Sequence, residues 1–462
     1  MLAALPPAVQ RPGFDRGALK PGIVHLGLGA FMRAHLAVYT DDALDAGAGP
    51  AWGISGVSLR QCDTRDALAP QQGLYTLALR DGDGERLRVI GSVLEALVAP
   101  EDPNAVAERI AHADTRIVSL TVTEKAYASQ APGSATATVV QGLALRHVRG
   151  LGPVTLLSLD NLPANGRVLS RGVLALAERL GGAALHDWIA AGCTFPCSMV
   201  DRIVPRTTDA DRDRIGAALG AHDAWPVVAE PYIDWVLEDC FAAGRPDWPG
   251  VRCVATQGDV AAWERLKLRM VNGAHSALVY LGVVAGWATV DVAIGQPAMQ
   301  RFIAALLRDE VEPTLTGLAV PPDFRTRLLQ RFANPALAHR CAQIAMDGSQ
   351  KIPQRLLATV RDRLAAGASI EQLAMALAGW LHFLRGHDEA GESYAVDDPL
   401  AAALQAQWRQ AQALASAMAR AEHLTRFAPV FGDLAGEPRL VAALAPRLQS
   451  LRERGVAATL GA

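Results

Sequence analysis

Short apolar runs and helix-like stretches alternate along the first half of the chain. The apolar runs that predict strands lie at 22–30, 52–59, 115–122 and 154–159. Stretches with helical spacing, such as 103–113 and 169–180, separate some of them. Because strands that alternate with helices build parallel sheets, this half predicts an α/β domain. Residues 75–98 differ, since strand-like runs flank an Asp-Gly-Asp-Gly turn, which predicts a hairpin and therefore a mixed sheet.

From about residue 259 the apolar residues take up helical spacing, and strand signals nearly vanish. The helix-like segments are 263–284, 299–315, 324–332, 354–367 and 370–386. This change predicts a boundary near Asp259 between an α/β domain, 1–258, and an all-α domain, 259–462.

Composition narrows the class of protein. The 462 residues include 44 Lys and Arg against 47 Asp and Glu, for a formal net charge of −3. A chain this close to neutral lacks the basic character that binding to a nucleic-acid backbone needs. The six cysteines are scattered without paired CxxC spacing, which predicts neither a zinc site nor a disulfide framework.

Targeting signals are weak. The N-terminal segment has no basic region, and Pro6 and Pro7 interrupt its apolar residues. The longest apolar stretch, 277–290, falls short of the ~20 residues that a membrane span needs. We therefore expect a cytoplasmic protein with no membrane or nucleic-acid partner, as a monomer or a weak homo-oligomer.

The first apolar run leads into Gly27-Leu28-Gly29, and a helix-compatible segment follows. Glycines between a strand and a helix allow a tight turn and close approach of the backbone to a pyrophosphate. The pattern is incomplete, because Met32 stands at the position of the third glycine, and an ordinary turn is the alternative. The strand–GxG–helix context favours a nucleotide site.

The cofactor expected in such a site is NAD, with NADP left open. Asp63 can hydrogen-bond a ribose hydroxyl, whereas Arg60 can meet a 2′-phosphate. The predicted cofactor-binding residues are Gly27, Leu28, Gly29, Ala30, Phe31, Arg33, Arg60 and Asp63.

Residues 264–276 form the most informative segment. On a regular helix an apolar stripe lies beside Lys267, and Glu264, His275 and Asn272 follow over roughly 140° of arc. A lysine against apolar surface can have its pKa lowered and act as a general base, while Asn and His hydrogen-bond a substrate oxygen. A solvated flank with a Glu–Lys pair is the alternative interpretation.

At these residues the sequence resembles the mannitol dehydrogenase family of polyol-specific long-chain dehydrogenases. The matching blocks are IVHLGLGAFMRAHLAVYTDD (23–42), WGISGVSLR (52–60), SLTVTEKAY (119–127), LSLDNLPANG (157–166), FPCSMVDRIVP (195–205), EPYIDWVLEDCFAAGRPDW (230–248), KLRMVNGAHSALVYLG (267–282) and HRCAQIAMDGSQKIPQRLL (339–357). The resemblance implies a Rossmann-type N-terminal domain and an all-α C-terminal domain, similar to 6-phosphogluconate dehydrogenase, with the active site between them.

The resemblance also implies roles for single residues. Lys267 corresponds to the general acid/base of a zinc-independent hydride transfer. Asn161 and Asn272 correspond to the amides that polarise the reacting oxygen, which suits neutral donors aimed at developing negative charge. His275 corresponds to a residue that orients a hydroxyl. Glu264 and Asp201 match acids that relay protons or tune the lysine.

The substrate is a sugar acid or a polyol. Lys351 corresponds to a substrate-contacting lysine, and Gln343 stands where mannitol dehydrogenases tend to carry arginine. Segments 195–205 and 379–401 look closest to the fructuronate reductase (D-mannonate oxidoreductase) members. A uronate carboxylate needs a cationic partner, and Lys351 and Arg355 are the candidates. For Arg355, a surface cation near a helix end is the alternative interpretation. The family's usual histidine is replaced at Met32, and the segment 128–140 is shorter than expected.

The leading hypothesis is therefore an NAD(P)-dependent enzyme that reversibly reduces D-fructuronate to D-mannonate. One alternative is a mannitol 2-dehydrogenase or a D-arabinitol-type polyol dehydrogenase. A second is a non-catalytic NAD-binding sensor, against which the presence of Lys267, Asn272, His275 and Asn161 argues.

Overall fold

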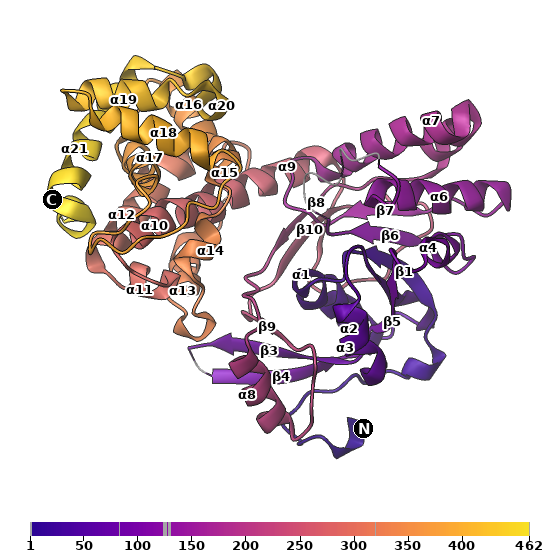
Figure 1. Cartoon of the computed structure of the whole chain (residues 1–462). Helices are drawn as coiled ribbons and strands as arrows, with labels where there is room; N and C mark the ends of the chain where they lie inside the picture. Colours follow the sequence, from indigo (N-terminus) through magenta and orange to yellow (C-terminus); the bar gives the residue numbers. More distant parts are fainter. Residues whose placement is uncertain (1, 83, 123–126, 128–130, 319, 462) are drawn as a thin grey trace. The chain divides into compact units, whose positions relative to one another are not determined.

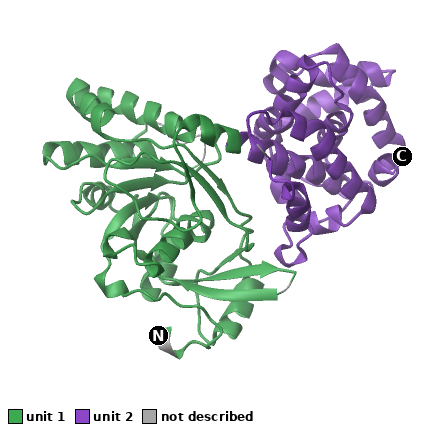
Figure 2. Cartoon of the chain, turned by 180° about the vertical axis from the view of Figure 1, so that it is seen from behind, with its two compact units in different colours: residues 1–263 green, residues 264–462 purple. Residues whose placement is uncertain are grey.

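The computed structural model describes residues 2–82, 84–122, 127, 131–318 and 320–461. Within these residues the chain forms two compact units, Met1–Trp263 and Glu264–Ala462 (Figure 2). The division falls inside one helix, α9 (Gln257–Leu266), close to the change in apolar spacing near Asp259.

Five parallel strands form the central sheet of the first unit (Figure 1). Their order is β5 (Val93–Val98), β2 (Gly53–Ser58), β1 (Pro21–Leu26), β6 (Ile117–Leu120) and β7 (Thr155–Ser158). The strands β1, β2, β6 and β7 are almost wholly buried, which is why they read as continuous apolar runs rather than as an alternating pattern. Since all five run in one direction, the segments that follow their carboxyl ends meet at one edge.

Successive residues of the strands point to opposite faces of the sheet and belong to two separate hydrophobic cores. Ile23 and Ile54 belong to the core that includes α1 (Ala30–Ala34) and α2 (Leu36–Asp45). Val24 and Val57 belong to the opposite core, which includes the helices α4 (Pro103–Ile110), α6 (Ala135–Val148) and α7 (Asn165–Gly192). The sheet is therefore covered on both faces, as the α/β prediction requires.

The predicted hairpin forms, but in a sheet of its own. The antiparallel pair β3 (Tyr75–Asp81) and β4 (Gly84–Ile90) is joined by the parallel strand β9 (Val227–Ala229). The third sheet also mixes directions and contains β8 (Ser198–Asp201), β10 (Asp234–Glu238) and β11 (Arg252–Val254). Mixed pairing is thus confined to the two small sheets, and the central sheet is parallel throughout. Two further helices of this unit are α3 (Asp63–Leu68) and α8 (Asp209–Leu219).

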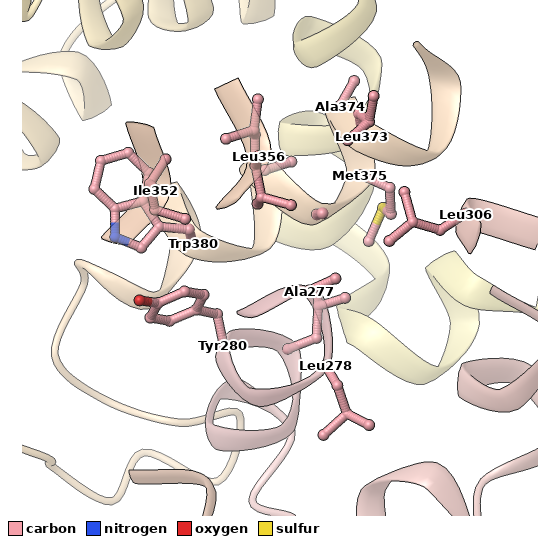
Figure 3. Packing of buried hydrophobic residues seen from close by; sticks show 14 of the residues in the cluster. Ala277, Leu278, Tyr280, Leu306, Ile352, Leu356, Leu373, Ala374, Met375 and Trp380 are labelled. Carbon is pink, nitrogen blue, oxygen red and sulfur yellow. The ribbon is translucent and has the colours of Figure 1, made fainter. Parts of the chain in front are cut away.

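Among its described residues, the regular elements of the second unit are helices, joined by turns and loops. Its core is built around α10 (Gly273–Val284) and α17 (Glu371–Phe383), as Figure 3 shows for Tyr280 and Trp380. The other helices are α11 (Val290–Ile294), α12 (Pro297–Ala305), α13 (Phe324–Phe332), α14 (Cys341–Ala345), α15 (Gly348–Ile352), α16 (Ala358–Ala365), α18 (Ala401–Gln412), α19 (Ala417–Thr425), α20 (Ala428–Phe431) and α21 (Pro438–Leu460). Among the described residues, none of these helices is long and apolar enough to cross a membrane.

In the part of this unit that the structure describes, three segments are π-helical: η5 (Lys267–Asn272), η6 (Leu306–Val311) and η9 (Pro353–Leu357). The segment η5 joins α9 to α10 without a break and packs against both η6 and η9. Wide turns of this kind are rare and recur at functional sites.

Candidate active site

A hollow of about 1030 Å³ lies at the carboxyl edge of the parallel sheet. Its lining comes from the turns that follow β1, β2, β6 and β7 and from the start of α6. The predicted residues that line it are Gly27, Leu28, Gly29, Ala30, Phe31, Arg60, Asp63 and Asn161. The structure thus gathers residues far apart in the sequence at the edge where doubly wound sheets bind ligands.

The two glycines of the turn have different roles. Gly27 has φ +105°, and a Cβ there would lie 2.1 Å from the carbonyl oxygen of Thr121, so the fold itself requires this glycine. Gly29 has φ −87°, and a Cβ there would meet nothing closer than the Gly27 carbonyl oxygen at 3.9 Å. A methyl at position 29 would therefore occupy the hollow, where only a ligand would oppose it.

Buried polar side chains hold the Gly27–Gly29 turn in place. The His25 ring contacts the Ser119 hydroxyl at 2.8 Å and the Thr121 hydroxyl at 2.9 Å, and Thr121 donates to the Gly27 carbonyl at 2.8 Å. Burial lowers the pKa of His25 to about 3, so its ring is neutral. These bonds join β1 to β6 directly beneath the glycine turn.

Asn161 is exposed in the hollow on a turn that neighbouring residues hold. The Asp160 carboxylate accepts the Val122 N–H at 3.0 Å and the Tyr127 hydroxyl proton. The Asn165 side chain donates to the carbonyl oxygens of Asp160 and Ser198, at 3.0 and 2.9 Å. Asn161 is therefore presented by a well-bonded turn after β7, in the same hollow as the predicted cofactor residues.

One predicted cofactor residue lies elsewhere, and part of a segment predicted to affect substrate access falls outside the described residues. Arg33 does not line the hollow, because its guanidinium donates to the Trp225 carbonyl and lies over the Tyr75 ring, 5.3 Å from the centroid. Burial lowers the pKa of Arg33 to about 10. Residues 123–126 and 128–130 are outside the described residues, so the effect of the short 128–140 segment stays a prediction.

Lys267 and Asn272 lie in the π-helical segment, which changes the geometry expected from the sequence. The Gly273 N–H bonds the Leu268 carbonyl five residues back, the pattern of a π turn. A π turn brings residues five apart closer together around the helix axis than the roughly 140° that separates them in a regular helix. Lys267 is 7% exposed and Asn272 is half-buried. The structure thus places the predicted base and the predicted amide on one side of the helix.

His275 and Glu264 flank this pair along the same helix, and both side chains are buried. The His275 ring stacks on Phe332 with centroids 4.1 Å apart. Burial first, and then the charges of His339, Arg355, Arg331 and Lys267, lower the pKa of His275 well below its usual range. A neutral imidazole of this kind can donate one hydrogen bond to a hydroxyl or accept one from it.

Arg355 lies in η9, against the same helix. Its Nη1 donates to the Ser276 hydroxyl at 3.3 Å, and a Cβ on Gly273 would lie 3.0 Å from its carbonyl oxygen. The glycine of the N-G pair therefore lets η9 approach α10 closely. Among the described residues Arg355 has no acidic partner within ion-pair distance. Burial lowers the pKa of its guanidinium.

The remaining predicted site residues, Lys351, Gln343 and Asp201, differ in their burial and contacts. The Lys351 ammonium donates to the carbonyls of Met346 (2.5 Å) and Ile344 (3.2 Å), and burial together with the charge of Arg355 lowers its pKa to about 8. Gln343 is exposed on α14. Asp201 is buried at the end of β8 and pairs in register with Asp234, whose pKa burial raises.

The sequence reasoning missed several residues of these regions. Ser134 and Thr121 line the hollow, and His339 lies edge-on to His275 with ring centroids 6.3 Å apart. One overlooked signal is the scarcity of lysine: the chain has only Lys20, Lys125, Lys267 and Lys351 among its 44 basic residues. Because arginine supplies almost all of the basic residues, the few lysines are the candidates for a position that needs an amine able to titrate.

Comparisons with known proteins cover almost the whole chain. Residues 21–250 match the mannitol dehydrogenase Rossmann domain, and residues 259–452 match the mannitol dehydrogenase C-terminal domain. A D-mannonate oxidoreductase of Escherichia coli is 40% identical over 97% of this chain and 96% of that protein. A mannitol 2-dehydrogenase of Pyrenophora tritici-repentis is 38% identical over 98% of this chain and 83% of that protein.

A solved structure agrees with these matches. The Pseudomonas fluorescens mannitol 2-dehydrogenase, solved as a ternary complex with NAD and D-mannitol, is 35% identical and has a TM-score of 0.88. The comparison covers 100% of this chain and 97% of that one. Both domain matches and relatives of nearly equal length show that the chain belongs to the mannitol dehydrogenase family.

Proposed function

We propose that this protein is an NAD-dependent oxidoreductase that reversibly reduces the keto group of D-fructuronate to give D-mannonate. Membership of the mannitol dehydrogenase family supports the reaction class, and the E. coli D-mannonate oxidoreductase is a relative of matching length. The observation that carries the choice of substrate is Arg355, a partly buried guanidinium with no acidic partner among the described residues.

The hollow at the edge of the parallel sheet fits a dinucleotide. It is open above Gly29, where a Cβ would project into free space, and it contains the starts of α1 and α6. The Gly27–Phe31 turn would hold the pyrophosphate, and Arg60 and Asp63 would contact the adenosine ribose. When bound, NAD accepts or supplies the hydride.

The predicted catalytic residues supply the proton chemistry. Lys267 donates a proton to the oxygen of the keto group during reduction and removes it during oxidation. Asn272, on the same side of the π turn, and Asn161 donate amide hydrogen bonds to that oxygen as negative charge develops. His275, neutral and buried, binds a hydroxyl of the substrate. Glu264 and Asp201 are proposed to relay protons to solvent.

A carboxylate at one end of the substrate would supply the counter-charge that Arg355 lacks among the described residues. A buried guanidinium without a counter-charge is costly, and a carboxylate offers two acceptors that match its fork. Lys351 adds a second cation nearby, since its own pKa responds to the charge of Arg355. A neutral polyol offers hydroxyls alone and would leave the charge of Arg355 uncompensated.

A polyol dehydrogenase is the second candidate, since mannitol 2-dehydrogenases are nearly as similar as the mannonate enzyme. Steady-state kinetics with fructuronate, tagaturonate, fructose and xylulose, each with NADH and NADPH, separate the two. We expect the highest kcat/KM with fructuronate and NADH. A higher kcat/KM with fructose or xylulose would overturn the choice of substrate.

A charge-deleting variant sharpens this test. Arg355→Gln is expected to raise the KM for fructuronate about 10- to 100-fold, the loss typical of a charge-assisted hydrogen bond, and to change the KM for fructose less than threefold. Arg361→Gln is the matched control, because Arg361 forms an exposed ion pair with Asp433 on the same unit. Equal effects of Arg355→Gln on both substrates would exclude a carboxylate at this position.

A further inference from the structure

Two neighbouring imidazoles in the second unit each carry a buried ring nitrogen without a hydrogen-bond partner. They are Nε2 of His275, on α10, and Nδ1 of His339, in the segment that precedes α14. The rings meet edge to face, with centroids 6.3 Å apart and planes at 81°. Buried polar atoms are nearly always satisfied in folded proteins, so two adjacent exceptions point to a missing polar group.

The His275 ring and the His339 backbone are held in place by contacts that do not use these nitrogens. His275 stacks on Phe332. The backbone around His339 is pinned to the start of α11, since the Val290 N–H donates to the His339 carbonyl at 2.9 Å and Thr289 bridges to Arg340. A rotation of the His275 ring would therefore cost its stacking on Phe332.

The surroundings keep both rings uncharged. Burial lowers the pKa of His339 to about 4, and the cations Lys267, Arg331 and Arg355 oppose protonation of His275. A neutral imidazole carries one N–H donor and one acceptor nitrogen. Two such rings can therefore offer one donor and one acceptor to a single group, and the partner that uses both is a hydroxyl.

We infer that His339 is a substrate-binding residue that holds, together with His275, one secondary hydroxyl of the sugar chain. The assignment rests on the proposed oxidoreductase function and adds a second ligand to the hydroxyl that His275 binds. Since the hydroxyl does not react, the contact acts equally in the bound substrate and in the transition state. It thus selects substrates by KM, according to whether that hydroxyl is present.

The test pairs His339→Phe with analogues of the substrate that lack one hydroxyl each. Phe keeps the ring and its edge contact but removes both nitrogens. We expect kcat/KM for the full substrate to fall about tenfold, mainly through KM. With one analogue, the one that lacks the bound hydroxyl, wild type and variant should have the same kcat/KM.

His423→Phe is the matched control, since His423 is also half-buried with an unpartnered ring nitrogen but lies on α19. It should leave all kinetic constants unchanged, and the NADH Kd of both variants should match wild type. A His339→Phe enzyme within twofold of wild type on the full substrate, or an equal loss on every analogue, would overturn the assignment. The cycle is run on whichever of fructuronate and fructose wild type reduces, so failure of the substrate proposal leaves this test intact.

Discussion

The glycine turn offers a paired test of what holds the fold and what holds the cofactor. In Gly27→Ala the new Cβ would lie 2.1 Å from the backbone oxygen of Thr121, at a φ of +105°. The backbone strain costs about 1–3 kcal/mol, and forcing β1 and β6 apart adds about the same again. We expect the free energy of unfolding to fall by about 2–6 kcal/mol and the midpoint of thermal unfolding by roughly 10 °C.

Gly29→Ala is the matched partner, with an opposite outcome. Its φ of −87° accepts alanine, and its Cβ contacts nothing nearer than 3.9 Å, so stability should equal or slightly exceed that of wild type. The methyl would occupy the approach to the pyrophosphate, and we expect the Kd for NADH to rise about 10- to 100-fold, equivalent to about 1–3 kcal/mol.

Denaturant unfolding and quenching of tryptophan fluorescence by NADH measure the two quantities. If Gly29→Ala binds NADH like wild type, the hollow does not hold the cofactor at this turn. If Gly27→Ala retains full stability, the fold does not require a glycine at position 27.

Three further predictions concern the second unit and the buried histidines. Lys267→Ala should lower kcat about 10²- to 10⁴-fold with an unchanged Kd for NADH, and near-wild-type turnover would exclude Lys267 as the acid/base. Gly273→Ala, whose Cβ would lie 3.0 Å from the Arg355 carbonyl, should raise the KM for fructuronate several-fold with little change in unfolding midpoint, and an unchanged KM would contradict it. Burial lowers the pKa of His25 and of His382 to about 3, so the native state binds fewer protons than the unfolded state between pH 3 and 6.5. The free energy of unfolding should therefore fall as pH drops, by about 4 kcal/mol from these two groups between pH 7 and 5, and equal stability at both pH values would refute this.

The sequence predicted the parallel sheet well, because strands buried on both faces leave an unmistakable apolar run between turns. It also predicted a hairpin within 75–98, since turn chemistry is local, but only Tyr75–Ile90 forms it and Val93–Val98 joins the central sheet. It did not indicate which sheet the hairpin joins, because that pairing depends on β9, about 150 residues further along the chain. Long-range pairing leaves no trace in local spacing.

The site was predicted unevenly for a similar reason. Gly27–Phe31, Arg60, Asp63 and Asn161 follow strand ends, so topology alone gathers them. The position of Lys267 relative to Asn272 depends on a π turn, which packs against η6 and η9. A projection of the sequence onto a regular helix cannot show this turn. Arg33 lies on the short helix α1, whose buried side faces Tyr75, and one-dimensional proximity to the glycines was misleading there.

The π turn between Lys267 and Asn272 can be described as a regular helix that has gained one residue. In that description, the spacing of five between the lysine and the asparagine is a spacing of four with one inserted residue. Removing one residue between them would leave a spacing of four, which an ordinary α-helix holds within about 40° on one face. Loss of the π turn at the present length would instead rotate the two side chains apart. Relatives with a spacing of four should therefore have a regular helix here and keep the pair, so that the length of this segment alone indicates the form of the helix.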